Sequence, residues 1–371
     1  MRLKESPVVA LLGARQVGKT TLSEQVAAAW QGTSTVFDLE RPAARAALQS
    51  TPEKTLGELP GLVIIDEVQR MPELFEILRP LCDARDRKAV FLLLGSASWD
   101  LIKGVSETLA GRIQFVDVPG FSLAETGVEN QDVLWFRGGF PRAFLAADGG
   151  AWERWMDNFT RTFLERDIPG LGSQVAPETL GRFWKMLAHF HGQIWNAAEL
   201  ARSMGVSAPA MNRYLDLLAG TYMARVLPPW FENLGKRLVK SPKVYLRDSG
   251  ILHHLLGVRD MPGLRTHPRY GASWEGFAIE QTLIAHGGRD AWFYSTQRGA
   301  ELDLLLLRGG KRWGFEFKCS DAPGTTKSMH VSLADLKLEH LWVVYPGTLR
   351  YGLAEKITAL PLREIGGLSL A

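Results

Sequence analysis

The strongest chemical signal is a glycine-rich loop, from Gly13 to Thr21, that reads GARQVGKTT. In a loop of this kind at a helix start, backbone N–H groups bind phosphate oxygens. Lys19 would reach the β- and γ-phosphates, and the Thr20 hydroxyl would bind Mg²⁺. The alternative is an ordinary glycine-rich turn, but an apolar run precedes the loop and a helical pattern follows it. The predicted nucleotide-binding residues are Gly13, Ala14, Arg15, Gln16, Val17, Gly18, Lys19, Thr20 and Thr21.

Two adjacent carboxylates, Asp66 and Glu67, directly follow the apolar run Leu62–Ile65. A strand that ends in two acids suits a magnesium-binding motif of nucleoside triphosphatases. Asp66 would hold the metal together with Thr20, and Glu67 would act as a catalytic residue that orients and activates the attacking water. An Asp-Glu pair can also simply begin a loop, but its position after the phosphate loop favours the catalytic interpretation.

Two further candidates lie downstream of another apolar run, Val90–Leu94, which is followed by Gly95. Ser96 could hydrogen-bond the γ-phosphate or the attacking water, and Ser96 and Ser98 could equally cap the following helix. Arg112 could act as an arginine finger, often supplied by a neighbouring subunit, that stabilises transition-state charge. The alternative for Arg112 is an ordinary surface arginine.

A second set of chemical residues flanks Gly309-Gly310 near the C-terminus. A two-residue Gly-Gly loop predicts a β-hairpin and sets its register. Asp303 then lies opposite Glu316, and Glu301 lies opposite Lys318. The period of two places these four on one face of the hairpin. The other face would carry Leu302, Leu304, Phe315 and Phe317.

Like charges directly opposite each other repel, and a divalent cation would relieve that repulsion. The spacing is similar to that of metal-dependent nucleases, in which carboxylates hold Mg²⁺ and a lysine positions the water. Glu275, in a helical pattern, could be a third acid. A solvated hairpin face and an inactive nuclease-like domain remain open as alternatives. The nuclease-like site would comprise Glu275, Asp303, Glu316 and Lys318.

The middle of the chain carries a helix-turn-helix pattern, 197–204 and 208–218, and then a basic stretch. The cations between positions 236 and 247 have no acid among them and could contact DNA phosphates. A winged helix that packs against the first domain is the alternative. The candidate DNA contacts are Lys236, Arg237, Lys240, Lys243 and Arg247.

Short apolar runs separated by helical patterns predict a parallel α/β sheet with both faces covered. These runs are Val8–Leu12, Thr35–Phe37, Leu62–Ile65 and Val90–Leu94. Long helical patterns begin near Trp152, and Pro262–Pro268 resembles a linker. The expected α/β organisation is a P-loop domain over 1–150, a helical winged-helix domain over 151–260 and a small α/β nuclease-like domain over 261–371.

The composition is that of an ordinary globular protein. The 371 residues are 46% hydrophobic and 22% charged, which excludes a disordered chain. A net charge of +3 permits an acidic partner such as nucleic acid without requiring one. Cys82 and Cys319 form no metal or disulfide framework, so a cytoplasmic location fits best. No apolar run is long enough to span a bilayer, and we expect no membrane partner.

Together these motifs resemble prokaryotic AAA-like, archaeal-type P-loop ATPases with a C-terminal DUF4143 domain. The resemblance implies an ATPase domain, a winged helix and a restriction-endonuclease-like domain, with ATP and Mg²⁺ as ligands. The choice of ATP over GTP follows from the resemblance alone, since few residues precede Val8, where such proteins carry a helix near the adenine. The segments that carry the resemblance are 13–21, 62–69, 92–98, 109–112, 140–144, 162–169 and 236–250, together with ELD at 301–303 and EFK at 316–318.

Three functional hypotheses follow. The first is a Mg²⁺-dependent ATPase whose nucleotide state controls how its C-terminal domains engage DNA or a protein partner. The second is an ATP-regulated, metal-dependent DNA endonuclease, which depends on the acidic face around Asp303. The third is a nucleotide-switched protein scaffold that binds no nucleic acid. A finger supplied in trans by Arg112 would make the protein a homo-oligomer.

Overall fold

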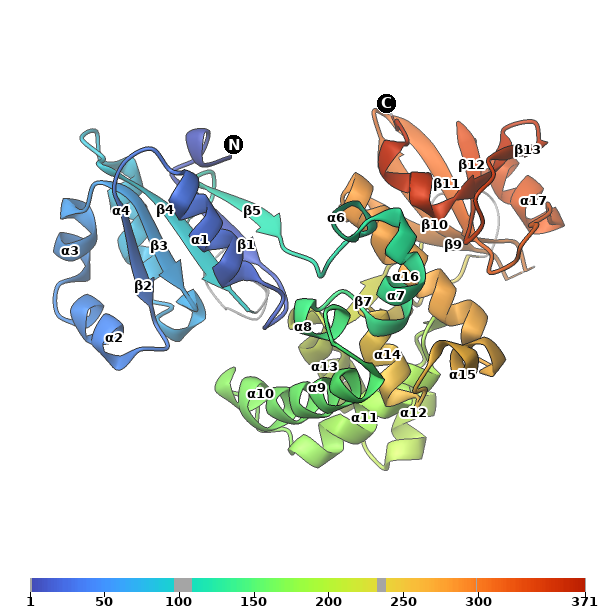
Figure 1. Ribbon diagram of the computed structural model, residues 1–371, viewed down its shortest axis with the longest axis horizontal. Helices are drawn as coiled ribbons and strands as arrows, with labels where there is room; N and C mark the ends of the chain where they lie inside the picture. The colour runs from blue at the N-terminus through green and yellow to red at the C-terminus, as the bar shows by residue number, and fades with distance from the viewer. Residues whose placement is uncertain (1, 97–108, 232–237, 298, 371) are drawn as a thin grey trace. The chain divides into compact units, whose positions relative to one another are not determined.

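The computed structural model describes residues 2–96, 109–231, 238–297 and 299–370 (Figure 1). The chain divides into two compact units. The N-terminal unit comprises Met1–Gly120 with Gly220–Tyr222, and the C-terminal unit comprises Phe121–Ala219 with Met223–Ala371. The C-terminal unit thus contains nearly all of the ranges predicted for the second and third domains, together with residues 121–150, which were predicted to belong to the P-loop domain.

A five-stranded sheet forms the centre of the N-terminal unit, in the order β2-β3-β4-β1-β5. All neighbouring strands are parallel, as predicted from the continuous apolar runs. The prediction contained four of the strands and missed the edge strand β5. The strands are β1 Val8–Leu12, β2 Ser34–Asp38, β3 Gly61–Asp66, β4 Ala89–Gly95 and β5 Ile113–Asp117.

Helices cover both faces of this sheet, and alternate residues of its buried central strands β3, β4 and β1 pack on opposite faces. On one face, Val9 and Leu11 pack with residues of α1, Lys19–Ala29. On the other face, Val8, Ala10 and Leu12 pack with α2, α3 and α4. These helices are α2 Pro42–Gln49, α3 Pro52–Glu58 and α4 Leu74–Asp83, and the short 3₁₀ segments are η1 Arg2–Lys4 and η2 Val68–Arg70. The carboxyl ends of β1, β3 and β4 consequently share one edge.

The C-terminal unit begins with a helical region that contains the predicted helix-turn-helix, α12 and α13. The Asn196 side chain caps α12, and Gly205 turns the chain in the left-handed region with φ 69°. The helices are α6 Leu123–Thr126, η3 Val128–Asn130, α7 Gln131–Arg137, α8 Pro141–Phe144, α9 Gly149–Thr162, the π-helix η4 Phe163–Asp167, α10 Ile168–Gly170, α11 Pro177–His189, α12 Ala197–Met204 and α13 Ala208–Gly220.

A small antiparallel sheet, β6-β8-β7, has its first strand between α11 and α12 and its other two strands after α13. Its strands are β6 Gln193–Ile194, β7 Ala224–Leu227 and β8 Lys243–Leu246, and α14 Ser249–Leu255 comes next. The segment expected to be a linker instead forms a helix, α15 Met261–Thr266. The Asp260 side chain caps this helix and Leu264 is buried beneath it, so local proline content was outweighed by capping and packing.

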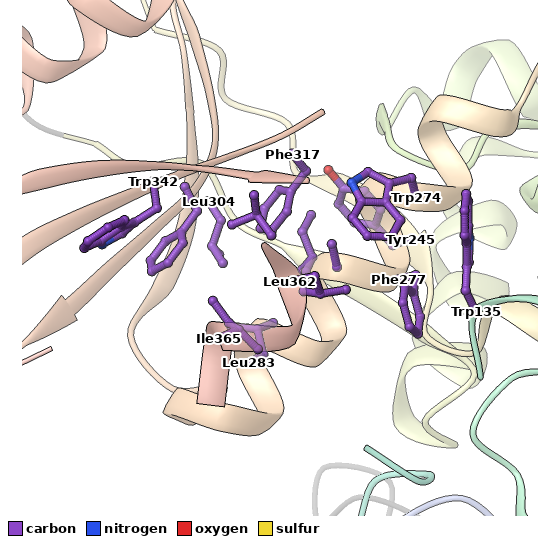
Figure 2. Packing of buried hydrophobic residues seen from close by; sticks show 14 of the residues in the cluster. Trp135, Tyr245, Trp274, Phe277, Leu283, Leu304, Phe317, Trp342, Leu362 and Ile365 are labelled. Atoms are coloured by element: carbon purple, nitrogen blue, oxygen red, sulfur yellow. The ribbon is translucent and has the colours of Figure 1, made fainter. Parts of the chain in front are cut away.

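The last part of the chain folds into a six-stranded mixed sheet, β13-β14-β12-β11-β10-β9. Helix α16 and the segment η5 pack on one face in the cluster shown in Figure 2, and α17 packs on the other. The elements are α16 Tyr270–His286, β9 Ala291–Ser295, β10 Glu301–Arg308, β11 Lys311–Phe317, α17 Lys327–Asp335, β12 His340–Tyr345, β13 Tyr351–Ala354, β14 Ile357–Pro361 and η5 Leu362–Gly367.

The predicted hairpin register about Gly309-Gly310 is confirmed next to the turn, from Leu304 paired with Phe315 to Arg308 paired with Lys311. The predicted apolar face is wrong at one residue. Leu304 and Phe315 belong to the cluster with α16, whereas Leu302 packs on the side of α17. A register shift between Leu302 and Leu305 in the pairing with β9 explains the change of side, because a bulge interrupts the alternation of faces.

Candidate functional site

The phosphate-binding loop connects β1 to α1 at the carboxyl edge of the N-terminal sheet. A side chain at Gly13 would place its Cβ 2.2 Å from the carbonyl oxygen of Val118, so this position admits only glycine. Gln16 and Gly18 are left-handed, with φ 64° and 102°. These conformations curl the loop so that it runs directly into α1, whose free N–H groups and dipole favour an anion.

Lys19 lies folded back over this loop. Its Nζ donates to the carbonyl oxygens of Gly13 at 3.0 Å and Ala14 at 2.9 Å, and only 6% of the residue is exposed. Burial lowers the pKa of Lys19 to about 8, although the nearby charges of Glu67 and Asp66 oppose that change. An anionic phosphate beside the ammonium would compensate for the burial of its charge.

Thr20 and Asp66 form the second part of the site. Thr20 Oγ1 donates to Asp66 Oδ2 at 2.8 Å, and the backbone N–H of Glu67 donates to Asp66 Oδ1 at 2.8 Å. Burial raises the pKa of Asp66, and the hydrogen bond from Thr20 opposes that rise. Hydroxyl and carboxylate oxygens are ligands that Mg²⁺ prefers, and it usually completes its shell with phosphate and water. This donor pair therefore fits magnesium.

Glu67 begins the 3₁₀ turn η2 in a left-handed conformation with φ 56°, which is uncommon for a residue other than glycine. Its Oε2 accepts from Gln69 Nε2 and from Ser96 Oγ at 3.3 Å. Gln69 Nε2 also donates to Ser96 Oγ at 2.9 Å. Ser96 thus contacts Glu67 at the end of β4, a contact that the sequence analysis did not predict, while Ser98 lies outside the residues that the structure describes.

Gln69 is a functional candidate that the sequence analysis missed. Its Oε1 is buried and has no hydrogen-bond partner among the described residues. The available signal was its place in the turn two residues after Glu67, which brings the amide back to the carboxylate. Arg15, at the other side of the loop, pairs with Glu40 at 2.7 Å.

Arg112 lies at the opposite edge of the sheet. It directly precedes β5, whose Ile113 pairs with Val8 at the start of β1, whereas the phosphate loop follows Leu12 at the end of β1. Five strand residues span roughly 16 Å, so Arg112 does not reach the loop of its own chain. Its guanidinium instead donates to both carboxylate oxygens of Asp83, at 2.6 and 2.8 Å, and lowers the pKa of that acid.

The C-terminal unit brings the predicted nuclease-like acids together, but around a lysine of β8. Lys243 Nζ lies 3.4 Å from Glu275 Oε1 and 3.5 Å from Asp303 Oδ1, and it also pairs with Glu301. Tyr245, on the same face of β8, donates its hydroxyl hydrogen to Glu275 Oε1 at 2.6 Å. The ammonium therefore lies where the carboxylates converge.

Glu316 and the second oxygen of Asp303 also have partners. Lys318 pairs with Glu316 at 2.9 Å, and Asp303 Oδ2 accepts from the backbone N–H of Phe317 at 3.0 Å. Burial, and then the charge of Asp303, raise the pKa of Glu275 to about 7 and raise that of Glu316 as well. Among the described residues no group of three His, Cys, Asp or Glu is placed to hold a metal. The arrangement does not fit a divalent ion.

The same contacts show that the prediction of DNA-contacting cations between positions 236 and 247 is wrong for Lys243 and Arg247. Lys243 is buried among acids, and Arg247 lies 3.3 Å from Glu280, which Arg225 also contacts. Lys240 is exposed, whereas Lys236 and Arg237 lie outside the described residues. The acids come from α16 and β10, which are distant in sequence, and for this reason the local absence of acid was misleading.

Two mycobacterial proteins match nearly the whole chain. The chain is 44% identical over 363 residues to the uncharacterized protein Rv2008c of Mycobacterium tuberculosis and to Mb2031c of Mycobacterium bovis. The matches cover 98% of this chain and 82% of each relative. Family models match residues 5–127 as an AAA domain, and residues 128–261 and 270–365 as domains of unknown function, DUF8612 and DUF4143. The chain belongs to the family of AAA-domain proteins with a C-terminal DUF4143 domain. The resemblance inferred from its motifs is therefore confirmed.

Solved structures are more distant from this AAA-domain protein. The Walker-type ATPase PABY2304 of Pyrococcus abyssi is 14% identical with a TM-score of 0.48, covering 68% of this chain and 92% of that chain. The Orc1 protein of Aeropyrum pernix in complex with DNA is 12% identical with a TM-score of 0.32, covering 69% and 87%. Similarity at this level carries no functional argument. Within the described residues, no helix has the length and apolar character needed to cross a membrane.

Proposed function

We propose that the AAA domain binds ATP with Mg²⁺ and hydrolyses its γ-phosphate. The observation that carries the proposal is the convergence of Lys19, Thr20, Asp66 and Glu67 at the carboxyl edge of one parallel sheet. These side chains supply a cation for phosphate, oxygen ligands for magnesium and a carboxylate beside the metal ligands. Ligand sites of open α/β sheets lie outside the carboxyl ends of the strands.

In this site the bound Mg²⁺ would neutralise charge on the phosphates. The loop backbone and Lys19 orient the phosphates, while Thr20 and Asp66 position oxygen atoms for the metal. Glu67 accepts a proton from the attacking water at its carboxylate. The amide of Gln69 and the hydroxyl of Ser96 hold Oε2 of that carboxylate in place.

We further propose that the nucleotide state controls how the C-terminal unit engages a macromolecular partner. The exposed side of α13 carries Asn212, Arg213 and Asp216, a mixed surface without a cluster of cations. This composition, with the burial of Lys243 and the pairing of the half-buried Arg247 with Glu280, favours a protein partner over sequence-specific DNA. The endonuclease alternative is not favoured, because an ammonium occupies the centre of the acidic cluster.

Calorimetry with Mg-ATP tests the binding step. The wild type should bind, and Lys19→Ala should lose measurable affinity while its melting temperature stays close to that of the wild type. Lys54→Ala, an exposed lysine of α3, is the matched control and should bind normally. Wild-type affinity in Lys19→Ala would refute the assignment of the loop.

The partner is tested by measuring ATP turnover with and without duplex and single-stranded DNA. We expect neither DNA to change the rate by more than about twofold. Strong stimulation by DNA, with salt-dependent binding, would reassign the C-terminal unit as a DNA-binding element.

A further inference from the structure

We propose that Lys243 is the resident cation of the carboxylate cluster formed by Glu275, Glu301, Asp303 and Glu316, where it replaces a divalent metal and fastens β8 to α16 and β10. This proposal is independent of ATP hydrolysis in the N-terminal unit. It assigns the acidic cluster a structural role at the junction between the small sheet and the six-stranded sheet.

The position of the ammonium is set by a buried strand. All four residues of β8 are buried, and Lys243 is 5% exposed. Its Nζ lies 5.7 Å from the centre of the Phe293 ring, on β9. A buried lysine is costly unless it is paired and hydrogen-bonded. Here the compensation comes from Glu275, Glu301 and Asp303.

Two side chains of β8 converge on the same acid. Lys243 and Tyr245 are two residues apart and project from the same face of the strand. Glu275 Oε1 receives the Tyr245 hydroxyl at 2.6 Å and lies 3.4 Å from Lys243 Nζ. Tyr245 itself belongs to the buried cluster shown in Figure 2, with Trp274 and Phe317. The polar contacts are therefore held in register by apolar packing.

The position of the Lys243 ammonium explains why a metal ion is disfavoured. A metal at the convergence of Glu275 and Asp303 would compete with the ammonium for the same oxygen atoms and would be repelled by it. Lys318 is paired with Glu316. Burial disfavours the charged form of Lys243, but the neighbouring Tyr245, Glu275, Asp303 and Glu301 outweigh this and raise its pKa.

An open metal site and a lysine-filled cluster predict opposite effects of one substitution. If Asp303 and Glu316 repelled each other in an open site, Asp303→Asn would raise the stability of the metal-free protein. If Lys243 is the resident cation, Asp303→Asn removes one of its partners and lowers stability. The sign of the change therefore separates the two accounts.

Thermal melting of the full-length protein, with EDTA or with Mn²⁺, tests the proposal. The wild type should show no Mn²⁺-dependent shift. Lys243→Met should lower the melting temperature in EDTA by roughly 5–15 °C, as expected when a buried charge loses its partner, and should regain part of that loss with Mn²⁺. Lys240→Met, an exposed lysine three residues earlier, is the matched control and should change neither value.

If Lys243→Met does not fold, the single substitution Asp303→Asn distinguishes the lysine-filled cluster from an open metal site. We expect this variant to melt at a lower temperature in EDTA than the wild type. A Mn²⁺-dependent rise in the wild type that Asp303→Asn abolishes would overturn the proposal. A Lys243→Met protein as stable as Lys240→Met would overturn it as well.

Discussion

Thr20 Oγ1 lies 2.8 Å from Asp66 Oδ2, which joins the start of α1 to the end of β3 across 46 residues of sequence. Thr20 directly follows the glycine-rich loop at the start of α1, and Asp66 ends β3 at the carboxyl edge of the sheet. This contact is the structural basis for expecting a magnesium-dependent site rather than an anion site alone.

Removal of the Thr20 hydroxyl should separate metal from phosphate recognition. Thr20→Ala should weaken Mg-ATP binding by roughly 10- to 100-fold, as loss of a metal-orienting group does elsewhere. Binding of ATP in EDTA should change little, because the loop backbone and Lys19 remain. Calorimetry under the two conditions gives the comparison, and Thr20→Ser, which keeps the hydroxyl, is the control. Equal losses with and without magnesium would contradict the assigned role.

The amide of Gln69 should matter for turnover and not for binding. Gln69→Ala removes a hydrogen bond to Glu67 Oε2 and another to Ser96, so we expect kcat to fall by about 10- to 100-fold with KM nearly unchanged. Gln69→Glu should be at least as damaging, because it places a second carboxylate against Glu67. Gln49→Ala, at an exposed site on α2, is the control. A change confined to KM would argue against positioning of Glu67.

Arg112 can act as a finger only on the site of another copy, given its place at the amino edge of the sheet. Arg112→Ala should lower kcat far more than it weakens ATP binding. Mixing Arg112→Ala with Lys19→Ala should restore activity, because the first retains an intact phosphate loop and the second retains the arginine. Asp83→Asn tests whether the ion pair itself is needed. No recovery on mixing, at any protein concentration, would remove Arg112 from the catalytic machinery.

Two buried histidines should make the C-terminal unit sensitive to acid. Burial lowers the pKa of His191 to about 3 and of His253 to about 4, both below the usual 6.5. The unfolded chain therefore binds more protons than the folded one between those values and pH 6.5, and stability falls as pH decreases through this window. Each histidine contributes a slope of up to about 1.4 kcal/mol per pH unit.

Urea unfolding at pH 7, 6 and 5 measures that slope. His191→Asn keeps an acceptor for the backbone N–H of Leu246 and should flatten the pH dependence. His189→Gln, at an exposed site two residues earlier, should leave it unchanged. An unchanged slope in His191→Asn would show that this histidine is not the source of the acid sensitivity.

Local sequence patterns were sufficient for the AAA domain. Each of the runs at Val8, Thr35, Leu62 and Val90 lies within a parallel strand. The central strands β1, β3 and β4 are continuously apolar because they are buried on both faces, whereas β2 is an edge strand without a buried residue. The other edge strand, β5, was missed because Gln114 interrupts its apolar residues and leaves no continuous run. The Gly309-Gly310 turn gave the hairpin register for the same local reason.

Two of the errors arose from contacts between distant segments. The bulge that moves Leu302 to the other face depends on β9, and the burial of Lys243 depends on Glu275 and Asp303. A run of cations without nearby acids is usually exposed, but the charges that neutralise this one lie on other elements. Gln69 was missed because an amide near an acid has no distinctive spacing until the turn brings the two together.

The central claim is that Glu67 activates water for ATP hydrolysis, and steady-state phosphate release tests it most directly. The wild type should turn over Mg-ATP, whereas Glu67→Gln should bind Mg-ATP with similar affinity and lose at least about 100-fold in turnover, because an amide accepts no proton. Glu58→Gln, an exposed glutamate of α3, should behave as the wild type. Turnover in Glu67→Gln equal to that of the wild type, or a wild type that binds Mg-ATP and releases no phosphate, would contradict the account.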